Sequence, residues 1–481
     1  MTGNQLCNYP VFLLEIIGDL AVRHGAGVFV VGGTVRDWLS GVAPRDLDLA
    51  VSRGALDFAG DLARLTGGTF VLLDEKEQTA RVVWHECVVD VAGFRAGATD
   101  IRQDLVKRDF TINAMALPFG VGLAEGPDPG RIIDPAGGRH DLKGKIIRAI
   151  SPEAFVDDPL RLLRAFRFHA ETGFVIEPRT WQWLAHYRGL LADVSPERLS
   201  HELDCIMASK RAFAAVLLLD RAGILTGLFP ELAPGAGLEQ PASHHLDVFH
   251  HNLEALRRME EIIRQPGDFY PGHGEFMGGY LAGGKRVVRL KWAALFHDLG
   301  KPAACRRVDG RITFYNHDRI GADLLAGISK RLRWSREQFE RVSRFIILHM
   351  WPFHLSNVRR KTGVTARACL KIYKAAGDDL PGLFLLAMAD SLAGQGVDKP
   401  AGMEEELATL YSQVVDVCKN QVEPVLAGPR LLTGRDLIGL GLRPGPVFKQ
   451  ILAEVERVQV EGKVGNREQA LDWVNHFLSP H

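Results

Sequence analysis

The chain of 481 residues lacks an excess of charge of either sign. Its 58 lysines and arginines balance 58 aspartates and glutamates, which gives a formal net charge of zero at pH 7. Nucleic-acid-binding proteins usually show a basic balance, so the overall charge gives no support for RNA binding. A basic face balanced by acid elsewhere is still compatible with this composition. The candidates for such a face are residues 143–148 and the arginines between positions 161 and 211.

Cysteine is also scarce, and its spacing carries no motif. The six cysteines lie at positions 7, 87, 205, 305, 369 and 418, without the spacing of a zinc site or a redox pair. Reduced thiols of this kind are typical of a reducing compartment. We therefore expect a cytoplasmic protein without structural disulfides.

Long apolar runs are absent as well. No segment of 18 or more apolar residues occurs, and the sequence does not start with a charged segment followed by an apolar one. We expect neither a membrane-spanning helix nor a secretion signal, and hence no membrane partner. Low-complexity tracts and internal repeats are also absent. The length is too great for one hydrophobic core, so roughly two to four domains are expected.

A glycine pair directly after an apolar segment is the first feature that points to chemistry. Residues 28–31 are apolar and predict a buried strand. Gly32 and Gly33 follow at once, and glycine lets the backbone turn sharply and approach a ligand closely. Their exposed N–H groups, together with Arg36, form a candidate cradle for a triphosphate.

Two aspartates one residue apart follow this turn. Residues 46–51 predict a second strand, on which Asp46 and Asp48 share one face because side chains alternate along a strand. Two carboxylates on one face suit Mg²⁺ bridged to substrate phosphates. The pattern therefore indicates metal-assisted nucleotidyl transfer. The plain alternative is a glycine loop and two solvated aspartates on an edge strand.

The order of strand, glycine pair, Arg-Asp, helix and D-x-D strand resembles the head of the polynucleotide adenylyltransferase superfamily. Within it, the chain is most similar to the bacterial-type (class II) tRNA nucleotidyltransferases. The resemblance implies that Asp90, on a predicted third strand over residues 88–92, completes the catalytic set as the base for the attacking hydroxyl. An ion pair of Asp90 with Arg95 is the alternative.

Two further segments extend the resemblance. Residues 104–114 resemble the family's R-R-D-F-T-I-N-A segment, with Lys107 in place of the first arginine. The resemblance implies that Arg108 reaches the nucleotide phosphates, and a surface ion pair between Arg108 and Asp109 is the alternative. Residues 195–203 resemble the helix that closes the family's neck, and we expect that segment to be structural.

Residues 157–168 resemble the family's base-reading E-D-x-x-R motif. Asp158, Arg161 and Arg164 are spaced by three and share one face of a predicted helix. A carboxylate accepts from an exocyclic amino group and an arginine donates to ring acceptors. Asp158 and Arg161 could therefore accept CTP and ATP and reject UTP and GTP. The resemblance implies that Arg164 and Arg167 hold the triphosphate or the primer backbone; the alternative is a helix cap with a solvated basic stripe.

The second half of the sequence carries a histidine-rich constellation that resembles the HD metal-dependent phosphohydrolase domain. His297 and Asp298 are adjacent in an apolar helical segment, where two polar groups are costly unless they bind something. Imidazole and carboxylate ligands together suit Mn²⁺, Fe²⁺, Ni²⁺ or Zn²⁺. A buried structural role is the alternative for any single histidine, and whether the domain hydrolyses anything stays open. The resemblance implies a first metal on His251, His297, Asp298 and Asp390, with His317 and His349 at the extra positions of two-metal HD domains.

The predicted elements give an α/β head followed by an all-α remainder. Residues 1–148 mix short strands with helices, whereas later segments show helix-length apolar spacing. A linker is expected over residues 232–243 and a glycine-rich loop over residues 265–284.

Residues 431–468 again resemble the nucleotidyltransferases, whose tail holds the tRNA elbow; a small helical dimerisation unit is the alternative. The expected domains are a nucleotidyltransferase head (1–148), a helical neck (149–232), an HD domain (240–395) and a tRNA-binding tail (396–481).

Because the resemblance covers nearly the whole chain, it implies a tRNA 3′-end nucleotidyltransferase that adds C, A or both from CTP and ATP without a template. The family contains CCA-, CC- and A-adding enzymes and poly(A) polymerases. Only residues 96–103 separate Arg95 from Asp104, whereas full CCA- and A-adding relatives usually carry a longer flexible loop there. The short connection favours CC addition. No basic R-R-F segment follows the D-x-D strand, which counts against a poly(A) polymerase.

Two other functional classes are alternatives to a nucleotidyltransferase. The first is an HD phosphohydrolase whose head is inert, and the second is a non-catalytic RNA-binding or chaperone protein. The complete sets of carboxylates, arginines and histidines argue against both. The oligomeric state is not readable from the sequence, although an HD domain in such a chain could form a homodimer.

Overall fold

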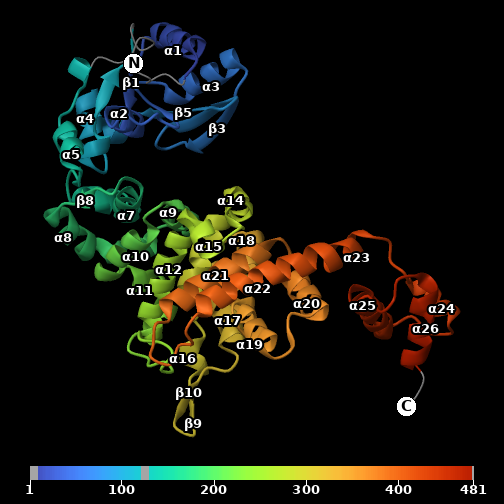
Figure 1. Ribbon diagram of the computed structural model, residues 1–481. Helices are drawn as coiled ribbons and strands as arrows, with labels where there is room; N and C mark the ends of the chain where they lie inside the picture. Colours follow the sequence, from blue (N-terminus) through green and yellow to red (C-terminus); the bar gives the residue numbers. More distant parts are fainter. Residues whose placement is uncertain (1–8, 121–128, 479–481) are drawn as a thin grey trace. The chain divides into compact units, whose positions relative to one another are not determined.

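The computed structural model describes residues 9–120 and 129–478 (Figure 1). Contacts within the chain divide it into two compact units. The first contains residues 1–206 and 218–224, and the second contains residues 207–217 and 225–481. The first unit carries the large β-sheet, whereas the second is almost entirely helical.

The sheet of the first unit has six strands in the order β3-β4-β5-β2-β1-β6. Its β2 and β5 run parallel, and all other neighbours run antiparallel. The three strands expected from the sequence are the adjacent β1, β2 and β5 near the middle of this order. The strands are β1 (Val28–Val31), β2 (Leu47–Val51), β3 (Thr69–Asp74), β4 (Thr79–Trp84), β5 (Cys87–Gly93) and β6 (Ala116–Pro118).

Amphipathic helices cover the sheet because their apolar side chains recur at helical spacing. The helix α3 (Ala55–Thr66) contacts β3, β4 and β5 and also packs on α1 (Val11–His24). On the side of β1, β2 and β6 lies α2 (Gly32–Leu39), which begins at the glycine pair. A short α4 (Ile101–Leu105) contributes Ile101 and Leu105 to a buried cluster with Val31 of β1.

The chain continues from the head into helices that carry the base-reading segment. In α7 (Arg161–Thr172) the apolar face is buried, including Leu162, Leu163 and Phe166, and the arginines lie on the other face. The remaining helices of this region are α5 (Gly138–Gly144), α6 (Glu153–Asp157), α8 (Pro178–Tyr187), α9 (Pro196–Ala208), α10 (Ala212–Arg221) and α11 (Leu225–Leu228).

The core of the second unit is formed by three helices. The helix α12 (Val248–Arg264) packs against both α15 (Arg286–Phe296) and α21 (Leu380–Ala393), and α21 is buried along nearly its whole length. Around them lie α16 (Lys301–Ala304), α17 (His317–Arg331), α18 (Arg336–Leu348), α19 (Trp351–Thr362), α20 (Ala366–Ala376), α22 (Met403–Val417) and the hairpin of β9 (Arg306–Val308) and β10 (Arg311–Thr313).

The prediction of a glycine-rich loop over residues 265–284 is wrong. That segment contains α13 (Pro266–Phe269) and α14 (Gly274–Ala282). Glycine lowers helix propensity, but Met277, Tyr280 and Leu281 recur at helical spacing and are buried. Burial of these side chains outweighs the weak propensity of the segment.

The end of the chain forms a small helical cluster of its own. It contains α24 (Gly434–Gly439), α25 (Pro446–Val460) and α26 (Arg467–Leu478), which share the buried side chains of Leu437, Val455 and Val474. Among the described residues, none of the helices is long and apolar enough to cross a membrane. The predicted fold class, an α/β head followed by a helical remainder, is confirmed.

Candidate active site and metal centre

The glycine pair lets the start of α2 approach the carboxylate of Asp48. Gly32 has φ +64°, and a Cβ at this position would lie 3.2 Å from Asp48 Oδ2 and 3.3 Å from Arg108 Nη1. A Cβ on Gly33 would also lie 3.2 Å from Asp48 Oδ2. The backbone N–H of Thr34 donates to the same oxygen at 3.3 Å. Both glycines are therefore needed to bring backbone donors next to a carboxylate.

Asp46, Asp48 and Asp90 form a cluster of acids at the adjoining strands β2 and β5. Asp48 is the register partner of Asp90, and Asp46 lies one residue before β2 rather than within it. Thr34 Oγ1 donates to the Asp46 carbonyl at 2.9 Å and accepts from the Asp48 N–H at 2.8 Å, which fixes the approach to the strand. Burial and the charge of Asp90 raise the pKa of both Asp46 and Asp48. Crowded carboxylates of this kind fit a divalent cation.

Asp90 has a partner that the sequence did not reveal. Arg81 on β4 donates to both carboxylate oxygens of Asp90, at 2.7 and 2.8 Å. The alternative of an Asp90–Arg95 pair is wrong, because Arg95 instead contacts Asp104 at 3.2 Å. Arg81 and Asp90 face each other in the antiparallel register of β4 and β5. The two-residue turn between these strands is the local signal that could have identified Arg81.

Arg108 is buried beside the carboxylate cluster. Its guanidinium donates to Asp104 from Nε at 3.1 Å and from Nη2 at 3.0 Å. Burial and the neighbouring charge of Arg95 lower the pKa of Arg108 to about 10. The alternative of a surface Arg108–Asp109 pair is wrong, because Asp109 pairs with Arg164 at 2.6 Å instead. Arg108 Nη1 lies 3.3 Å from the place that a Cβ on Gly32 would occupy, so this guanidinium lies next to the glycine turn.

The base-reading segment is arranged differently from the simple Asp-Arg pair that its spacing suggests. Asp158 accepts from Arg198 Nη2 at 3.0 Å, whereas Arg161 donates to the Ala154 carbonyl at 3.2 Å. Burial lowers the pKa of Arg161. Arg167 pairs with Glu202 at 3.0 Å. Arg198 lies on α9, in the segment expected to be structural, and no sequence pattern singled it out.

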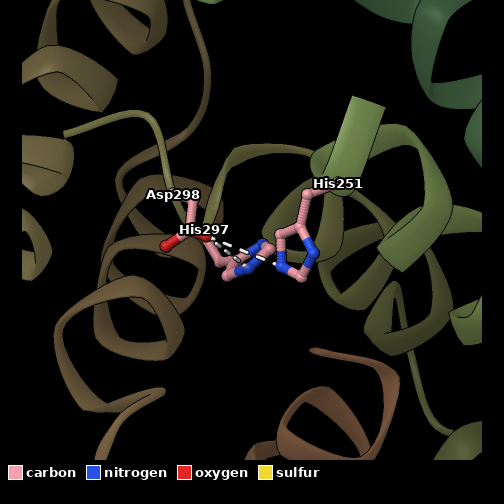
Figure 2. Close-up of side chains that lie close together, drawn as sticks. All are labelled: His251, His297 and Asp298. Carbon is pink, nitrogen blue, oxygen red and sulfur yellow. Dashed lines mark ion pairs between the residues drawn. The ribbon is translucent and has the colours of Figure 1, made fainter. Parts of the chain in front are cut away.

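In the second unit, all six expected HD residues lie close together. The Nε2 of His251 lies 3.0 Å from Asp390 Oδ1 and 3.6 Å from Asp298 Oδ2. The Nε2 of His297 lies 3.2 Å from the same Asp298 oxygen. Figure 2 shows both imidazoles directed toward Asp298, from α12 and from the end of α15. The ligand atoms of this trio lie within 4.8 Å of one another, which fits one metal ion.

The other oxygen of Asp298 faces a second pair of histidines. Asp298 Oδ1 lies 3.5 Å from His317 Nε2 and 3.7 Å from His349 Nε2, and these two nitrogens are 3.1 Å apart. The three ligand atoms again lie within 4.8 Å of one another. One carboxylate thus touches two groups of imidazoles, an arrangement suited to a bridging ligand between two ions.

Three of the imidazoles are oriented by a contact of the ring nitrogen that faces away from Asp298. The Nδ1 atoms of His297, His317 and His349 contact main-chain carbonyls at 3.0, 2.8 and 2.6 Å, which turns each Nε2 toward Asp298. His297 Nε2 and Asp298 Oδ1 are buried without a hydrogen-bond partner among the described residues, whereas Asp298 Oδ2 is contacted through ion pairs. Buried polar atoms without such partners are costly, so the donor set fits a metal ion.

Electrostatics in this centre are dominated by Asp298. Lys301, one helical turn after it, places its Nζ 2.5 Å from Oδ2 and was not singled out from the sequence. Burial alone would lower the pKa of His297, but Asp298 and Asp390 raise it to about 10. Burial and the charge of His317 lower the pKa of His349 to about 4. A metal binds the neutral imidazole, so it would have to displace the proton of His297, whereas the imidazole of His349 is already neutral at pH 7.

Three family models match the chain in order. They are the poly A polymerase head domain over residues 28–148, the probable RNA and SrmB-binding site of polymerase A over residues 173–235, and the HD domain over residues 248–394. The nucleotidyltransferase and HD families depend on metal ions.

Two tRNA nucleotidyltransferases match this chain along nearly its whole length. The A-adding tRNA nucleotidyltransferase of Deinococcus radiodurans is 33% identical, over 94% of this chain and 95% of that protein. The CC-adding tRNA nucleotidyltransferase of Thermus thermophilus is 31% identical, over 92% of each chain. Relatives with two different nucleotide specificities are thus similarly distant.

Solved structures share the fold. The Thermotoga maritima CCA-adding enzyme complexed with tRNA matches with a TM-score of 0.60 and 23% identity, over 98% of this chain and 95% of that one. A CCA-adding enzyme with CTP matches with a TM-score of 0.64 and 22% identity, over 98% and 96%. Together with the head, RNA-binding and HD matches, the full-length relatives establish that this chain belongs to the family of tRNA nucleotidyltransferases that carry an HD domain.

Proposed function

We propose that the chain adds C residues to the 3′ end of tRNA from CTP, and that another enzyme adds the terminal A. The observation that supports CC addition is the connection between β5 and α4. Only residues 94–100 join these elements, and Arg95, Thr99 and Asp100 tie them to Asp104 and Gln103 by hydrogen bonds. This connection is too short and too firmly attached to act as the long flexible loop of CCA- and A-adding relatives.

The head supplies the groups that nucleotidyl transfer requires. Asp46 and Asp48 would hold Mg²⁺, with Asp90 as the third acid after its release from Arg81. When bound, the metal would lower the pKa of the tRNA 3′-hydroxyl and neutralise the triphosphate. Asp90 would take the proton of the attacking hydroxyl, whose oxygen attacks the α-phosphorus with pyrophosphate as the leaving group.

Binding and selection of the nucleotide fall to the surrounding residues. The N–H groups at Gly32 and Gly33 and the guanidiniums of Arg36 and Arg108 would position phosphates. Asp158 would accept from the exocyclic amino group of cytosine, and Arg161 would donate to its ring acceptors. Arg164 and Arg167 would hold the triphosphate or the primer backbone.

Three tRNA transcripts test this assignment, ending before CCA, after the first C and after CC. With labelled CTP, ATP and Mg²⁺, we expect C to be added to the first two and nothing to be added to the third. Completion to CCA, or addition of A to the third transcript alone, would contradict the argument from the short connection. A chain that adds no nucleotide to any of them would contradict transfer itself.

Arg198 gives a separate test of base selection. Its ion pair with Asp158 orients that carboxylate, so Arg198→Gln is expected to lower the preference for CTP over UTP by about fivefold. This is the upper range for a half-exposed ion pair, about 1 kcal/mol. The measurement is the ratio of kcat/KM for the two nucleotides. Arg179→Gln, which removes an exposed arginine that stacks on Trp183, is the matched control; an equal change in both variants would contradict a role of Arg198.

We further propose that the HD centre binds a divalent transition metal, Mn²⁺, Fe²⁺, Ni²⁺ or Zn²⁺, and hydrolyses phosphate esters. The observation that favours this second activity is the position of Asp298 between two groups of imidazoles. A cytoplasmic location and a homodimer stay predictions.

A further inference from the structure

Phe168 on α7 lies among three arginines. The Cζ atoms of Arg36 and Arg164 are each 5.3 Å from the centroid of its ring, and that of Arg167 is 4.9 Å away. The residue is only 2% exposed. A phenyl ring attracts cations to its face, and the attraction grows when water is excluded. Arg36 comes from α2 in the head, so this ring connects the glycine turn with the base-reading helix.

Each of these arginines also has a polar contact that fixes one side of its guanidinium. Arg36 donates to Asn113 Oδ1 at 2.8 Å, and Arg164 donates from Nε to Asp109 at 2.8 Å. The pair of Arg167 with Glu202 supplies the third such contact. Arg36 and Arg164 are thus held by hydrogen-bond acceptors and Arg167 by an ion pair, while the same aromatic ring lies beside all three guanidiniums.

The ring itself is fixed. Phe168 meets the buried Phe110 edge to face, with centroids 5.5 Å apart and ring planes at 86°. Phe110 follows Asp109, so the segment that holds Arg164 also holds the ring on which Arg164 lies. A rigid ring at this position can define where all three cations lie.

We propose that Phe168 is a positioning residue that holds Arg36, Arg164 and Arg167 together as a binding site for the triphosphate. Each guanidinium has a separate carboxylate partner, Asp37, Asp109 or Glu202, so the ring is the one group that all three share. A triphosphate offers several negative oxygens to the group. This inference rests on the proposed function and assigns a role to a side chain that cannot itself contact phosphate oxygens through hydrogen bonds.

Stepwise fluorination of the ring tests the proposal with little change in shape. We would replace Phe168 with its mono-, di- and trifluorinated analogues and measure the dissociation constants of CTP and inorganic tripolyphosphate with Mg²⁺. Each fluorine weakens the negative face of the ring, so both constants are expected to rise stepwise, by about tenfold over the series. The same series at Phe166 is the control, because that buried ring on the same helix contacts Trp181 at 6.2 Å.

Binding constants that stay flat at position 168, or rise equally at position 166, would overturn the proposal. Phe168→Leu should weaken tripolyphosphate binding while Phe166→Leu should not, and thermal unfolding shows whether both variants fold. Because binding is measured without tRNA, it is independent of transfer. A wild-type chain that binds tripolyphosphate but adds nothing to tRNA would contradict the proposed function, whereas a flat fluorine series would contradict the role of Phe168 alone.

Discussion

Asp48→Asn is expected to lower the rate of CMP transfer to tRNA by about a thousandfold or more. The carboxylate lies at the glycine turn, where the backbone N–H of Thr34 donates to it, and it would be a ligand of Mg²⁺. Loss of metal stabilisation of the transition state costs several kcal/mol. The measurement is single-turnover incorporation of labelled CTP. Asp57→Asn, which changes an exposed acid on α3 of the same head, should leave the rate unchanged.

The same variant should be more stable than the wild type when metal is removed. The fold raises the pKa of Asp48, so its contribution to stability is fully present below the pKa of the unfolded chain. That contribution is lost as the pH rises through the higher pKa of the folded protein. At pH 7 without metal, Asp48→Asn should therefore raise Tm, and Mg²⁺ should raise Tm of the wild type more than that of the variant. A lower Tm of the variant under these conditions would contradict repulsion among the carboxylates.

Asp298→Asn should remove metal from the HD centre and leave transfer to tRNA unchanged. Its two oxygens face both groups of imidazoles, so one substitution affects both metal positions of the HD centre. We expect metal affinity to fall by about a hundredfold or more, since even partners of metal ligands contribute ten- to a hundredfold. The measurement is metal content after dialysis, together with hydrolysis of a chromogenic phosphodiester.

Two further variants keep this test interpretable. Asp298→Asn leaves Lys301 buried without its counter-charge, which destabilises proteins by several kcal/mol. The double variant Asp298→Asn, Lys301→Met removes both charges and should restore folding without restoring metal. Asp318→Asn, the acid after His317, is the matched control and should retain metal. Full metal content in the double variant would contradict the role of Asp298.

The part of the head around the glycine pair could be predicted from its sequence because its signals are local, whereas β3, β4 and β6 were not among the predicted strands. An apolar run, a glycine pair and an alternating D-x-D segment lie within 24 residues, from Val28 to Val51, and they form β1, α2 and β2. The order of the HD residues was similarly sufficient to name six side chains, and the structure brings those six together. Their roles as ligands stay predictions.

Partners across the fold could not be predicted in the same way. Asp104 and Asp109 both lie close to Arg108 in the sequence, so either could pair with it. The conformation of the segment decides that Arg108 pairs with Asp104, while Asp109 pairs with Arg164. Arg198 reaches Asp158 across 40 residues, so only the packing of α9 near α7 reveals the pair. Arginines are long and flexible, and spacing along the chain does not specify which carboxylate they reach.

The sharing of Asp298 between two groups of imidazoles also affects how the two activities could evolve. The head and the HD centre have no site residue in common, so a change at one need not affect the other. An aspartate codon becomes an asparagine codon by a single base change. A lineage in which the HD chemistry brought no advantage could lose it through that one position, with a second change that removes the uncompensated charge of Lys301, and still add nucleotides to tRNA. Regaining the chemistry would require the aspartate at position 298 to return.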